Sequence, residues 1–378
     1  MRNVVIAGYA RSPFGLANKG ELTKVRPDDL IVRVVEDLVQ KVGINGDDIE
    51  DLILGCAFPE GEQGLNMARL IALQAGLPQS VAGTTVNRFC GSSMQAIHIA
   101  AGAIQLDAGD NFICAGVESM TRVPMMGFNP MPNPKLHEML PEAYMSMGVT
   151  AENVAVRYQI SRDEQEKFAV DSHRKATAAR DGGRFQDEIV PIETTDGKVD
   201  ADGCIRSDTT AEALSELKPA FDENGSVTAG TSSPVTDGAA ATLVCSETYA
   251  EAKGLEPLAR IKSVSVAGCP PEIMGIGPVA ASRKALERAK VDVNDLDVIE
   301  LNEAFASQSL ACIRDLGLDA VKINLDGGAI ALGHPLGATG ARITGKAAAL
   351  LKREGGRYAL ATQCIGGGQG IATVLESL

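Results

Sequence analysis

Cys90 is the residue of this chain best suited to nucleophilic chemistry. It lies in the stretch 87–94, between a β-prone run and a run of small and apolar residues that predicts a helix. The free N–H groups and the dipole at the start of a helix stabilise an anion, so we expect a lowered pKa for this thiol. The alternative is a cysteine that only fills the core. This stretch by itself supports both interpretations equally.

His334 is the histidine best placed to activate such a thiol. It lies in a glycine-rich run, residues 327–337, which suggests that a ligand approaches the backbone closely. The sequence has 4 histidines. His98 falls within a predicted helix and is expected to be structural, whereas His137 and His173 lie in a polar region and are expected to be solvated. We therefore expect His334 to act in catalysis as a base.

Two more polar residues follow predicted strands. Cys364 precedes three successive glycines, where a thiol could serve as an acid or a base beside exposed N–H groups. An incidental cysteine in a glycine turn is an equally good explanation. Asn302 could hold a water or an oxyanion, although an Asx turn that caps the next helix is the simpler alternative.

The elements around these residues indicate an internal duplication. Cys90 and His334 each stand at the head of a small-residue run, 244 residues apart. The similar runs 51–58 and 298–305 are 247 residues apart. A third pair of strand-like runs, which begin at Ile113 and Ala359, is 246 residues apart. Agreement of the three offsets predicts two similar α/β halves, and packing about a pseudo-twofold axis would bring Cys90 and His334 together.

The duplicated halves are separated by a region of different character. Strands alternate with helices in the halves, and their apolar runs predict a largely parallel sheet covered on both faces. Residues from 121 to about 233 instead contain prolines, one charged helix at about 150–180, and polar loops. We predict a first half at 1–119 plus 234–257, an inserted loop region at 120–233, and a second half at 258–378.

Composition excludes several classes of function. The chain has 378 residues, a net charge of −14 and no tryptophan, which argues against nucleic acid or an anionic membrane surface as a partner. The 8 cysteines form no zinc-ligand spacing, so we expect no metal site and a reducing compartment. No apolar run reaches the ~18 residues of a membrane span. We expect no targeting segment before the first strand, and a cytoplasmic protein.

Four motifs, taken together and in order along the chain, resemble the thiolase family. They are residues 87–94, 302–305, 333–335 and 364–368. The resemblance covers essentially the whole chain. It implies an α/β fold of two βαβαβαββ halves in a five-layer αβαβα core, with an inserted loop domain. It also implies an acyltransferase that cleaves 3-ketoacyl-CoA with CoA, or condenses two acetyl-CoA.

The resemblance also implies roles for single residues. Cys90 matches the nucleophile that takes the acyl group, and His334 matches the base that activates it. Cys364 matches the acid or base that serves the acetyl carbon. Asn302 matches the residue that fixes a water in one oxyanion hole. The N–H groups of Cys90 and Gly366 match the other hole.

Coenzyme A is expected as a substrate, with no permanently bound cofactor. The segment 228–233 resembles the family's pantetheine segment, which assigns a contact to Ser233, although Thr231 replaces an asparagine. Arg206 matches a contact to the phosphate or adenine of CoA. In an acidic protein it could equally lie in a solvated ion pair.

Other motifs indicate the degradative 3-ketoacyl-CoA thiolases of fatty-acid β-oxidation. Short-chain biosynthetic members tend to carry histidine where Ser146 stands, so we expect a longer or broader acyl range. The alternatives are an acetyl-CoA C-acetyltransferase, a decarboxylating condensing enzyme, and a non-catalytic lipid-transfer or scaffold protein of the same fold. We expect acyl-CoA and CoA as substrates, a homodimer or homotetramer, and an association with a β-oxidation partner enzyme as a further possibility.

Overall fold

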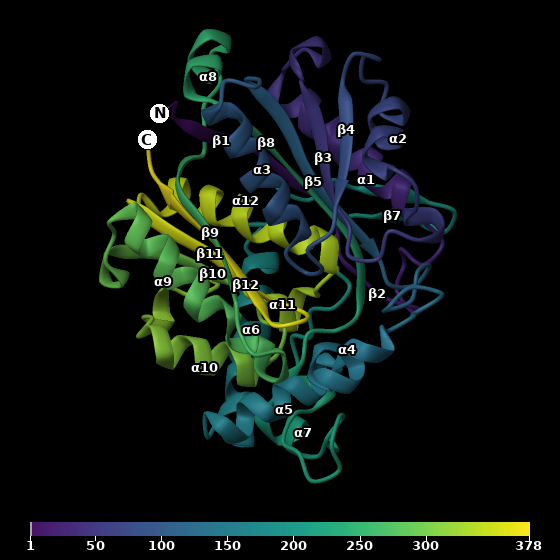
Figure 1. Cartoon of the computed structure of the whole chain (residues 1–378), viewed down its shortest axis with the longest axis vertical. Helices are drawn as coiled ribbons and strands as arrows, with labels where there is room; N and C mark the ends of the chain where they lie inside the picture. Colours follow the sequence, from purple (N-terminus) through teal and green to yellow (C-terminus); the bar gives the residue numbers. More distant parts are fainter. Residues whose placement is uncertain (1) are drawn as a thin grey trace.

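The buried strands of the chain assemble into one sheet of ten strands, seen in a computed structural model that describes residues 2–378 (Figure 1). Its order is β10-β11-β12-β9-β1-β8-β5-β3-β4, and the short β2 pairs with β8. The strands are β1 (Val4–Arg11), β2 (Gly15–Leu16), β3 (Asp51–Gly55), β4 (Ala82–Val86), β5 (Asn111–Ser119), β8 (Thr236–Ser246), β9 (Ala259–Gly268), β10 (Leu296–Leu301), β11 (Tyr358–Ile365) and β12 (Gln369–Glu376).

The sheet consists of two halves that meet at a short seam. Between β1 and β9 only two residue pairs are formed, Val5 with Arg260 and Ile6 with Ala259. The equivalent strands β3 and β10, and β5 and β11, hold the same places in their halves. Among the described residues of the second half, no full strand takes the place of β4 beside β10. A single bridge between Ile299 and Ile323 is formed there instead. The predicted duplication is therefore visible in the strand order.

The expectation of a largely parallel sheet is wrong. The pairs β3–β4, β3–β5 and β10–β11 are parallel, whereas β1–β8, β1–β9, β5–β8, β9–β12 and β11–β12 are antiparallel. The strand β8 is buried along its whole length although both of its neighbours are antiparallel. A strand covered on both faces has an apolar run in either orientation, so the sequence pattern could not distinguish the two.

Helices form three layers around the two half-sheets, which gives the predicted five-layer α/β core (Figure 1). α1 and α2 cover the first half-sheet, α9 and α10 cover the second, and α3 and α12 lie between them, in contact with each other. The helices of these layers are α1 (Pro27–Val42), α2 (Met67–Gln74), α3 (Ser92–Gln105), α9 (Gly277–Ala289), α10 (Ala306–Leu316) and α12 (Leu336–Glu354).

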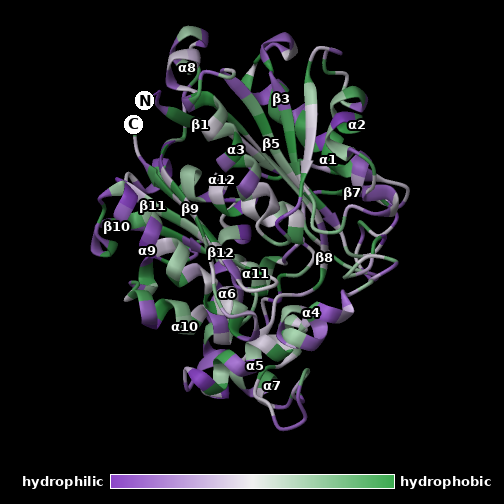
Figure 2. Cartoon of the chain, viewed as in Figure 1, coloured by the Kyte–Doolittle hydropathy of each residue, from purple (hydrophilic) through white to green (hydrophobic). Residues whose placement is uncertain are grey.

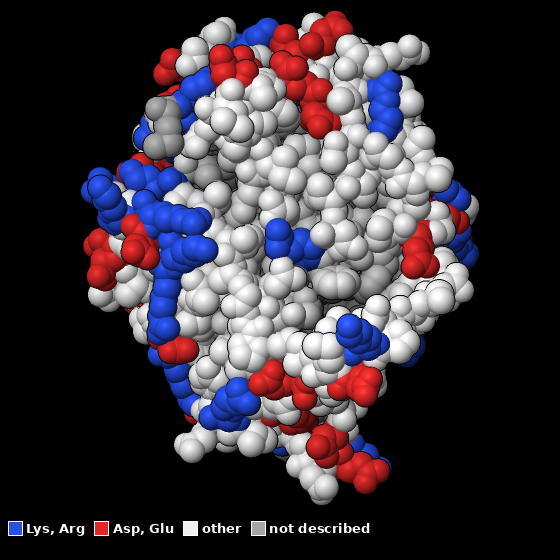
Figure 3. All heavy atoms as spheres, viewed as in Figure 1, with Lys and Arg blue, Asp and Glu red and all other residues white. Residues whose placement is uncertain are grey.

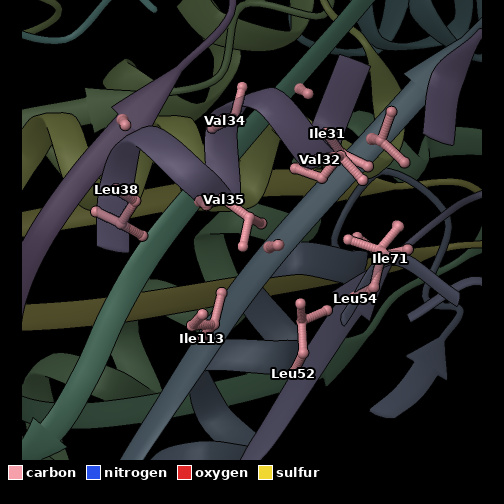
Figure 4. Close-up of a cluster of buried hydrophobic side chains, with 14 of the residues drawn as sticks. Ile31, Val32, Val34, Val35, Leu38, Leu52, Leu54, Ile71 and Ile113 are labelled. Atoms are coloured by element: carbon pink, nitrogen blue, oxygen red, sulfur yellow. The ribbon is translucent and has the colours of Figure 1, made fainter. Parts of the chain in front are cut away.

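The core under α1 shows how local sequence and packing agree. Pro27 starts the helix, two acidic residues occupy its first turn, and Gly43 ends it at φ +73°. Figure 2 shows the strands of both half-sheets as largely hydrophobic, with polar residues on the outer helices. Figure 4 shows the apolar side of α1 against β3, β5 and α2, with the side chains of Ile31, Val32, Val34, Val35, Leu38, Leu52, Leu54, Ile71 and Ile113.

The inserted region holds a long helix, α6, and several shorter elements. These are α4 (Pro134–Met139), α5 (Met147–Arg157), α6 (Arg162–Asp181), β6 (Ile192–Thr194), β7 (Gly197–Val199) and α7 (Ala211–Ser215). α8 (Glu247–Lys253) and α11 (Ala329–Leu332) lie in the connections of the two halves, as do several short 3-10 turns. No helix among residues 2–378 is long and apolar enough to cross a membrane. The domain boundaries given above stay a prediction.

The single charged helix expected at about 150–180 is two helices. Gln159 adopts φ +52°, which ends α5. Ser161 then caps α6: it accepts a hydrogen bond from the Glu164 N–H, and the Glu164 side chain accepts one from the Ser161 N–H. A capping box of this kind starts a helix. Its S-x-x-E signature stands in the sequence and could have located the break.

Candidate functional site

Cys90, His334 and Cys364 line one cavity of about 250 Å³. Residues from both halves and from the inserted region surround it, including Ser233, Met147 and Phe305. Two larger hollows, of about 590 and 400 Å³, have no cysteine or histidine in their walls. The smaller cavity is therefore the candidate active site, because among these three hollows it combines two thiols with an imidazole.

Cys90 lies in a sharp turn between β4 and α3. Phe89 adopts φ +43°, a conformation that costs energy for a bulky residue. The N–H of Gly91 then donates to the Arg88 carbonyl at 2.9 Å. A Cβ atom on Gly91 would lie 2.6 Å from Ile365 Cδ1 of β11, so a larger residue would have to displace the Ile365 side chain where this turn meets the second half.

The cysteine thiol is less acidic than the sequence predicts. Burial raises the pKa of Cys90 to about 11, although hydrogen bonds from the N–H groups of Gly366 and of Cys90 itself lower it in part. The expectation of a lowered thiol pKa at the helix start is wrong here, because removal of the sulfur from water outweighs the backbone donors. The structure brings the N–H of Gly366 to Cys90, the placement that the family resemblance implies.

The carbonyl of Cys90 is held from the other half. Gln363 of β11 donates a hydrogen bond through its Nε2 to the Cys90 carbonyl oxygen. Cys364 follows directly and is 1% exposed. Burial raises the pKa of Cys364 well above the ordinary thiol value, and the nearby Cys90 raises it further. At neutral pH this thiol therefore holds its proton, which is the state that a general acid needs.

His334 is bonded at both ring nitrogens. Its Nδ1 lies 2.6 Å from Thr339 Oγ1, and its Nε2 lies 3.4 Å from Asn302 Nδ2. The residue is 6% exposed. Burial lowers the pKa of His334 to about 3, and the charge of Arg342 acts in the same direction. The ring is therefore neutral at pH 7 and can accept a proton.

Asn302 does not cap the following helix. The residue before α10 is Phe305, and the Asn302 side chain contacts His334 instead. Its Oδ1 is buried and has no hydrogen-bond partner among the described residues. The Asx-turn alternative is thus wrong, and a buried free acceptor beside the imidazole is what a bound water or a substrate N–H would satisfy.

The loop that follows Asn302 is anchored by a buried carboxylate. Glu303 accepts hydrogen bonds from Ser172 Oγ at 2.6 Å, Asn324 Nδ2 at 2.7 Å and the Ile330 N–H at 3.2 Å. These donors belong to α6, to the segment after α10 and to α11, which precedes His334. Glu303 therefore ties the end of β10 to the inserted region and to the segment that leads to His334.

The two residues predicted to bind coenzyme A lie in different settings. Ser233 lines the cavity, and its Oγ donates to the Ala304 carbonyl at 3.1 Å. Arg206 is exposed, does not line the cavity, and forms no ion pair with the described residues. The structure thus brings Ser233 to Cys90 and leaves Arg206 on the surface of the inserted region.

His173 is a correction to the sequence prediction. It was expected to be solvated, but it is 6% exposed on the inner side of α6, and its Nδ1 accepts a hydrogen bond from the Arg206 N–H at 3.1 Å. His98 and Thr373 are in contact at 2.9 Å, consistent with a structural histidine. The sequence pattern did not indicate that one face of α6 is buried, because the residues on that face are small or polar and not apolar.

Several residues that hold the site were not singled out from the sequence. Thr339 contacts the imidazole, Gln363 holds Cys90, and Glu118 bonds to the start of α12. Only Thr339 could have been identified from the sequence. It stands one helical turn after Pro335, where the helix that follows His334 is expected to begin. Gln363 and Glu118 are brought to the site by contacts between the halves.

Comparison with known proteins identifies relatives over the whole chain. Residues 4–248 match the family model of the thiolase N-terminal domain, and residues 255–377 match that of the thiolase C-terminal domain. A 3-ketoacyl-CoA thiolase of Bacillus subtilis is 49% identical over 389 residues, which cover 100% of both chains.

Two solved structures have the same fold. The human mitochondrial 3-ketoacyl-CoA thiolase in complex with CoA has a TM-score of 0.93 and 38% identity, and the match covers 100% of this chain and 98% of that one. The Bacillus anthracis acetyl-CoA acetyltransferase has a TM-score of 0.92 and 42% identity, with 100% and 99% covered.

Proposed function

The chain belongs to the thiolase family of acyltransferases, and we propose that it cleaves 3-ketoacyl-CoA with CoA to give acetyl-CoA and a shortened acyl-CoA. The observation that carries this proposal is the cavity shared by Cys90, His334 and Cys364, with Asn302 bonded to the imidazole. Carbon–carbon cleavage needs a nucleophile, a base and a separate acid, and these residues supply one of each.

In the first step, Cys90 takes the acyl group. His334 Nε2 accepts the thiol proton as the sulfur adds to the 3-keto carbon. The negative oxygen that forms lies at the N–H groups of Cys90 and Gly366, the two donors that reach the sulfur in the free enzyme. One such donor is typically worth about 10²–10³ in rate, so both contribute strongly.

In the second step, the bond between the α- and β-carbons breaks and releases the enolate of acetyl-CoA. The protonated Nε2 of His334 and a water held by Asn302 stabilise the enolate oxygen. Cys364 gives its proton to the enolate carbon and becomes a thiolate. Its raised pKa suits this role, because a thiol that holds its proton tightly is present as the acid before the step.

In the third step, CoA regenerates the enzyme. The Cys364 thiolate takes the proton of the CoA thiol, and the CoA sulfur adds to the acyl group on Cys90. The Cys90 sulfur leaves and recovers its proton from His334. All protons return to their starting positions, and the reaction as proposed uses no resident metal or redox cofactor.

The surroundings of the cavity support a coenzyme A thioester with a broad acyl range. A related human enzyme has been solved in complex with CoA. Ser233 lies in the wall for contact with the pantetheine, and Arg206 is free for the distal phosphates. Ser146 is small, and adaptable apolar residues line the same wall: Met120, Met125, Met147, Met274 and Phe221.

We also propose a homodimer or homotetramer in the cytoplasm. The strand β4 ends the sheet with an unpaired outer edge, which in natural proteins is usually covered. The middle of the face in Figure 3 carries few charged residues. Exposed apolar side chains on β4's neighbours would be covered by a second copy, namely Leu70, Leu73, Phe89, Ile99 and Leu106.

The second candidate is an acetyl-CoA C-acetyltransferase, favoured by the likeness to the Bacillus anthracis enzyme. Thiolysis of 3-ketoacyl-CoAs from C4 to C16, together with condensation of acetyl-CoA, distinguishes the two. We expect cleavage of substrates longer than C4 to exceed that of acetoacetyl-CoA. Activity confined to C4 would favour the second candidate, and no thiolysis of any length would leave a non-catalytic member of the fold.

A further inference from the structure

We propose that Thr339 is a positioning residue, which holds His334 in the tautomer with a proton on Nδ1 and an unprotonated Nε2, whose lone pair accepts a hydrogen bond from Asn302 at rest. The inference deepens the proposed function, since that lone pair is the one that receives the Cys90 proton. Hydrogen positions follow here from the partners of each atom, because each side chain can donate only the protons that it has.

The Thr339 side of the ring decides the first nitrogen. A threonine hydroxyl has one proton to donate, and Thr339 Oγ1 lies 2.9 Å from the carbonyl oxygen of Pro335, one turn earlier in the chain. Hydroxyls on a helix commonly donate to this carbonyl. With its proton so used, the Thr339 oxygen accepts from His334 Nδ1 at 2.6 Å, and Nδ1 must carry the proton.

The Asn302 side of the ring requires the same tautomer independently. Asn302 Nδ2 lies 3.4 Å from His334 Nε2, and an amide nitrogen can only donate. A proton on Nε2 would set two donors against each other. The amide oxygen of Asn302, Oδ1, is buried and has no hydrogen-bond partner among the described residues when Nδ2 faces the ring.

The neutral Thr339 hydroxyl affects the protonation of the imidazole differently from a carboxylate partner. A carboxylate at Nδ1 stabilises the imidazolium, whereas a hydroxyl supplies orientation without charge. Burial and the charge of Arg342 lower the pKa of His334 to about 3. The resting pair is therefore a neutral imidazole beside a Cys90 thiol. His334 becomes charged only while the proton is in transit, when both nitrogens donate, one to Thr339 and one to the substrate oxygen.

Thr339 is fixed strongly enough to impose this orientation. It is fully buried, in the first turn of α12. Residues on both sides of it are anchored across the halves, since the Gly337 N–H donates to Glu118 Oε2 at 2.9 Å and the Ala341 N–H donates to Ser93 Oγ at 2.8 Å. These bonds fix the backbone, and the hydrogen bond to the Pro335 carbonyl fixes the side chain that carries the oxygen.

The test compares Thr339→Val, which keeps the shape and removes the oxygen, with Thr339→Ser, which keeps the oxygen. Thr344→Val is the matched control: Thr344 is also fully buried in α12 and donates to the carbonyl four residues earlier, Gly340, at 2.7 Å, but it does not touch His334. Nitrogen NMR of protein with ¹⁵N-labelled histidine reports the protonated ring nitrogen, and the chain has only 4 histidines. His334→Gln assigns the signal.

We expect Nδ1–H in the wild type, in Thr339→Ser and in Thr344→Val. Thr339→Val should show a mixture or the opposite tautomer, with kcat for thiolysis reduced about 10–100-fold and KM nearly unchanged. A wild-type His334 with its proton on Nε2, or a Thr339→Val protein with unchanged tautomer and kcat, would overturn the proposal. So would an equal loss of kcat in Thr344→Val. If the wild type cleaves no 3-ketoacyl-CoA, the proposed function fails, while the NMR result still decides the role of Thr339.

Discussion

The N–H of Gly337 donates a hydrogen bond of 2.9 Å to Glu118 Oε2, which joins the two halves of the molecule directly beside His334. Glu118 is the second-last residue of β5 in the first half, and Gly337 lies in the first turn of α12 in the second. The same carboxylate accepts from the N–H groups of Ala57 and Phe58. One buried side chain thus sets the distance between the turn that follows β3 and the segment that carries the imidazole.

Replacement of Glu118 by glutamine should therefore lower both stability and activity. An amide has one acceptor oxygen, and its NH₂ group would face backbone donors. Each buried donor left unpaired costs about 1–3 kcal/mol. We expect a clear drop in Tm and a loss of kcat, measured by thermal unfolding and thiolysis. Glu166→Gln, the same exchange at a buried carboxylate of α6 that does not line the cavity, is the control. An unchanged Tm in Glu118→Gln would contradict the joining role.

The thiol pKa of Cys90 gives a prediction for pH. Burial raises it to about 11, so from pH 6.5 to 9.5 the thiolate is a minor form that grows about tenfold per unit. Alkylation of Cys90 by iodoacetamide, followed by peptide mass spectrometry, should therefore accelerate over this whole range without a plateau. A plateau below pH 8 would mean that the resting enzyme holds a thiolate, stabilised by a protonated His334.

The exposed Arg206 allows a test of coenzyme A binding. Its side chain is free of ion pairs, so Arg206→Glu should leave the fold unchanged and place a negative charge where a phosphate is expected. We expect KM for CoA thioesters to rise several-fold, with turnover of a short pantetheine thioester much less affected. Lys198→Glu, another exposed cation of the inserted region, is the comparison. Equal effects on both thioesters would remove Arg206 from the binding site.

Much of the site could be predicted from the sequence, because the duplication itself brings Cys90 and His334 together. Two helix starts at equivalent places in two related halves meet between the half-sheets, and the repeated offsets revealed that equivalence. Asn302 and Gly366 lie beside them in the structure, and each follows a strand of the second half, β10 and β11.

The remaining features depend on packing that no local pattern encodes. The pKa of Cys90 is expected to fall at a helix start, but it rises because desolvation of the sulfur outweighs the backbone donors. His173 is buried by the contact between α6 and the segment that carries Arg206. The mixed sheet was also not predicted, because buried strands have the same apolar composition whether they are parallel or antiparallel to their neighbours.

The central claim is that Cys90 carries the acyl group while Cys364 moves only the proton of the acetyl carbon. Cys90→Ala should therefore abolish acylation and cleavage alike. Cys364→Ala should still be acylated at Cys90 by a simple acyl-CoA. Cys312→Ala is the matched control, because Cys312 is a fully buried thiol of α10 that does not line the cavity.

The most direct measurement follows two exchange reactions in the Cys364→Ala enzyme. Acyl exchange between an acyl-CoA and a pantetheine thioester reports Cys90, and deuterium exchange at the methyl group of acetyl-CoA reports the acid. The account predicts that acyl exchange largely persists while deuterium exchange falls about 10²–10⁴-fold, the usual contribution of a general acid or base. Deuterium exchange at the wild-type rate in this variant would contradict it.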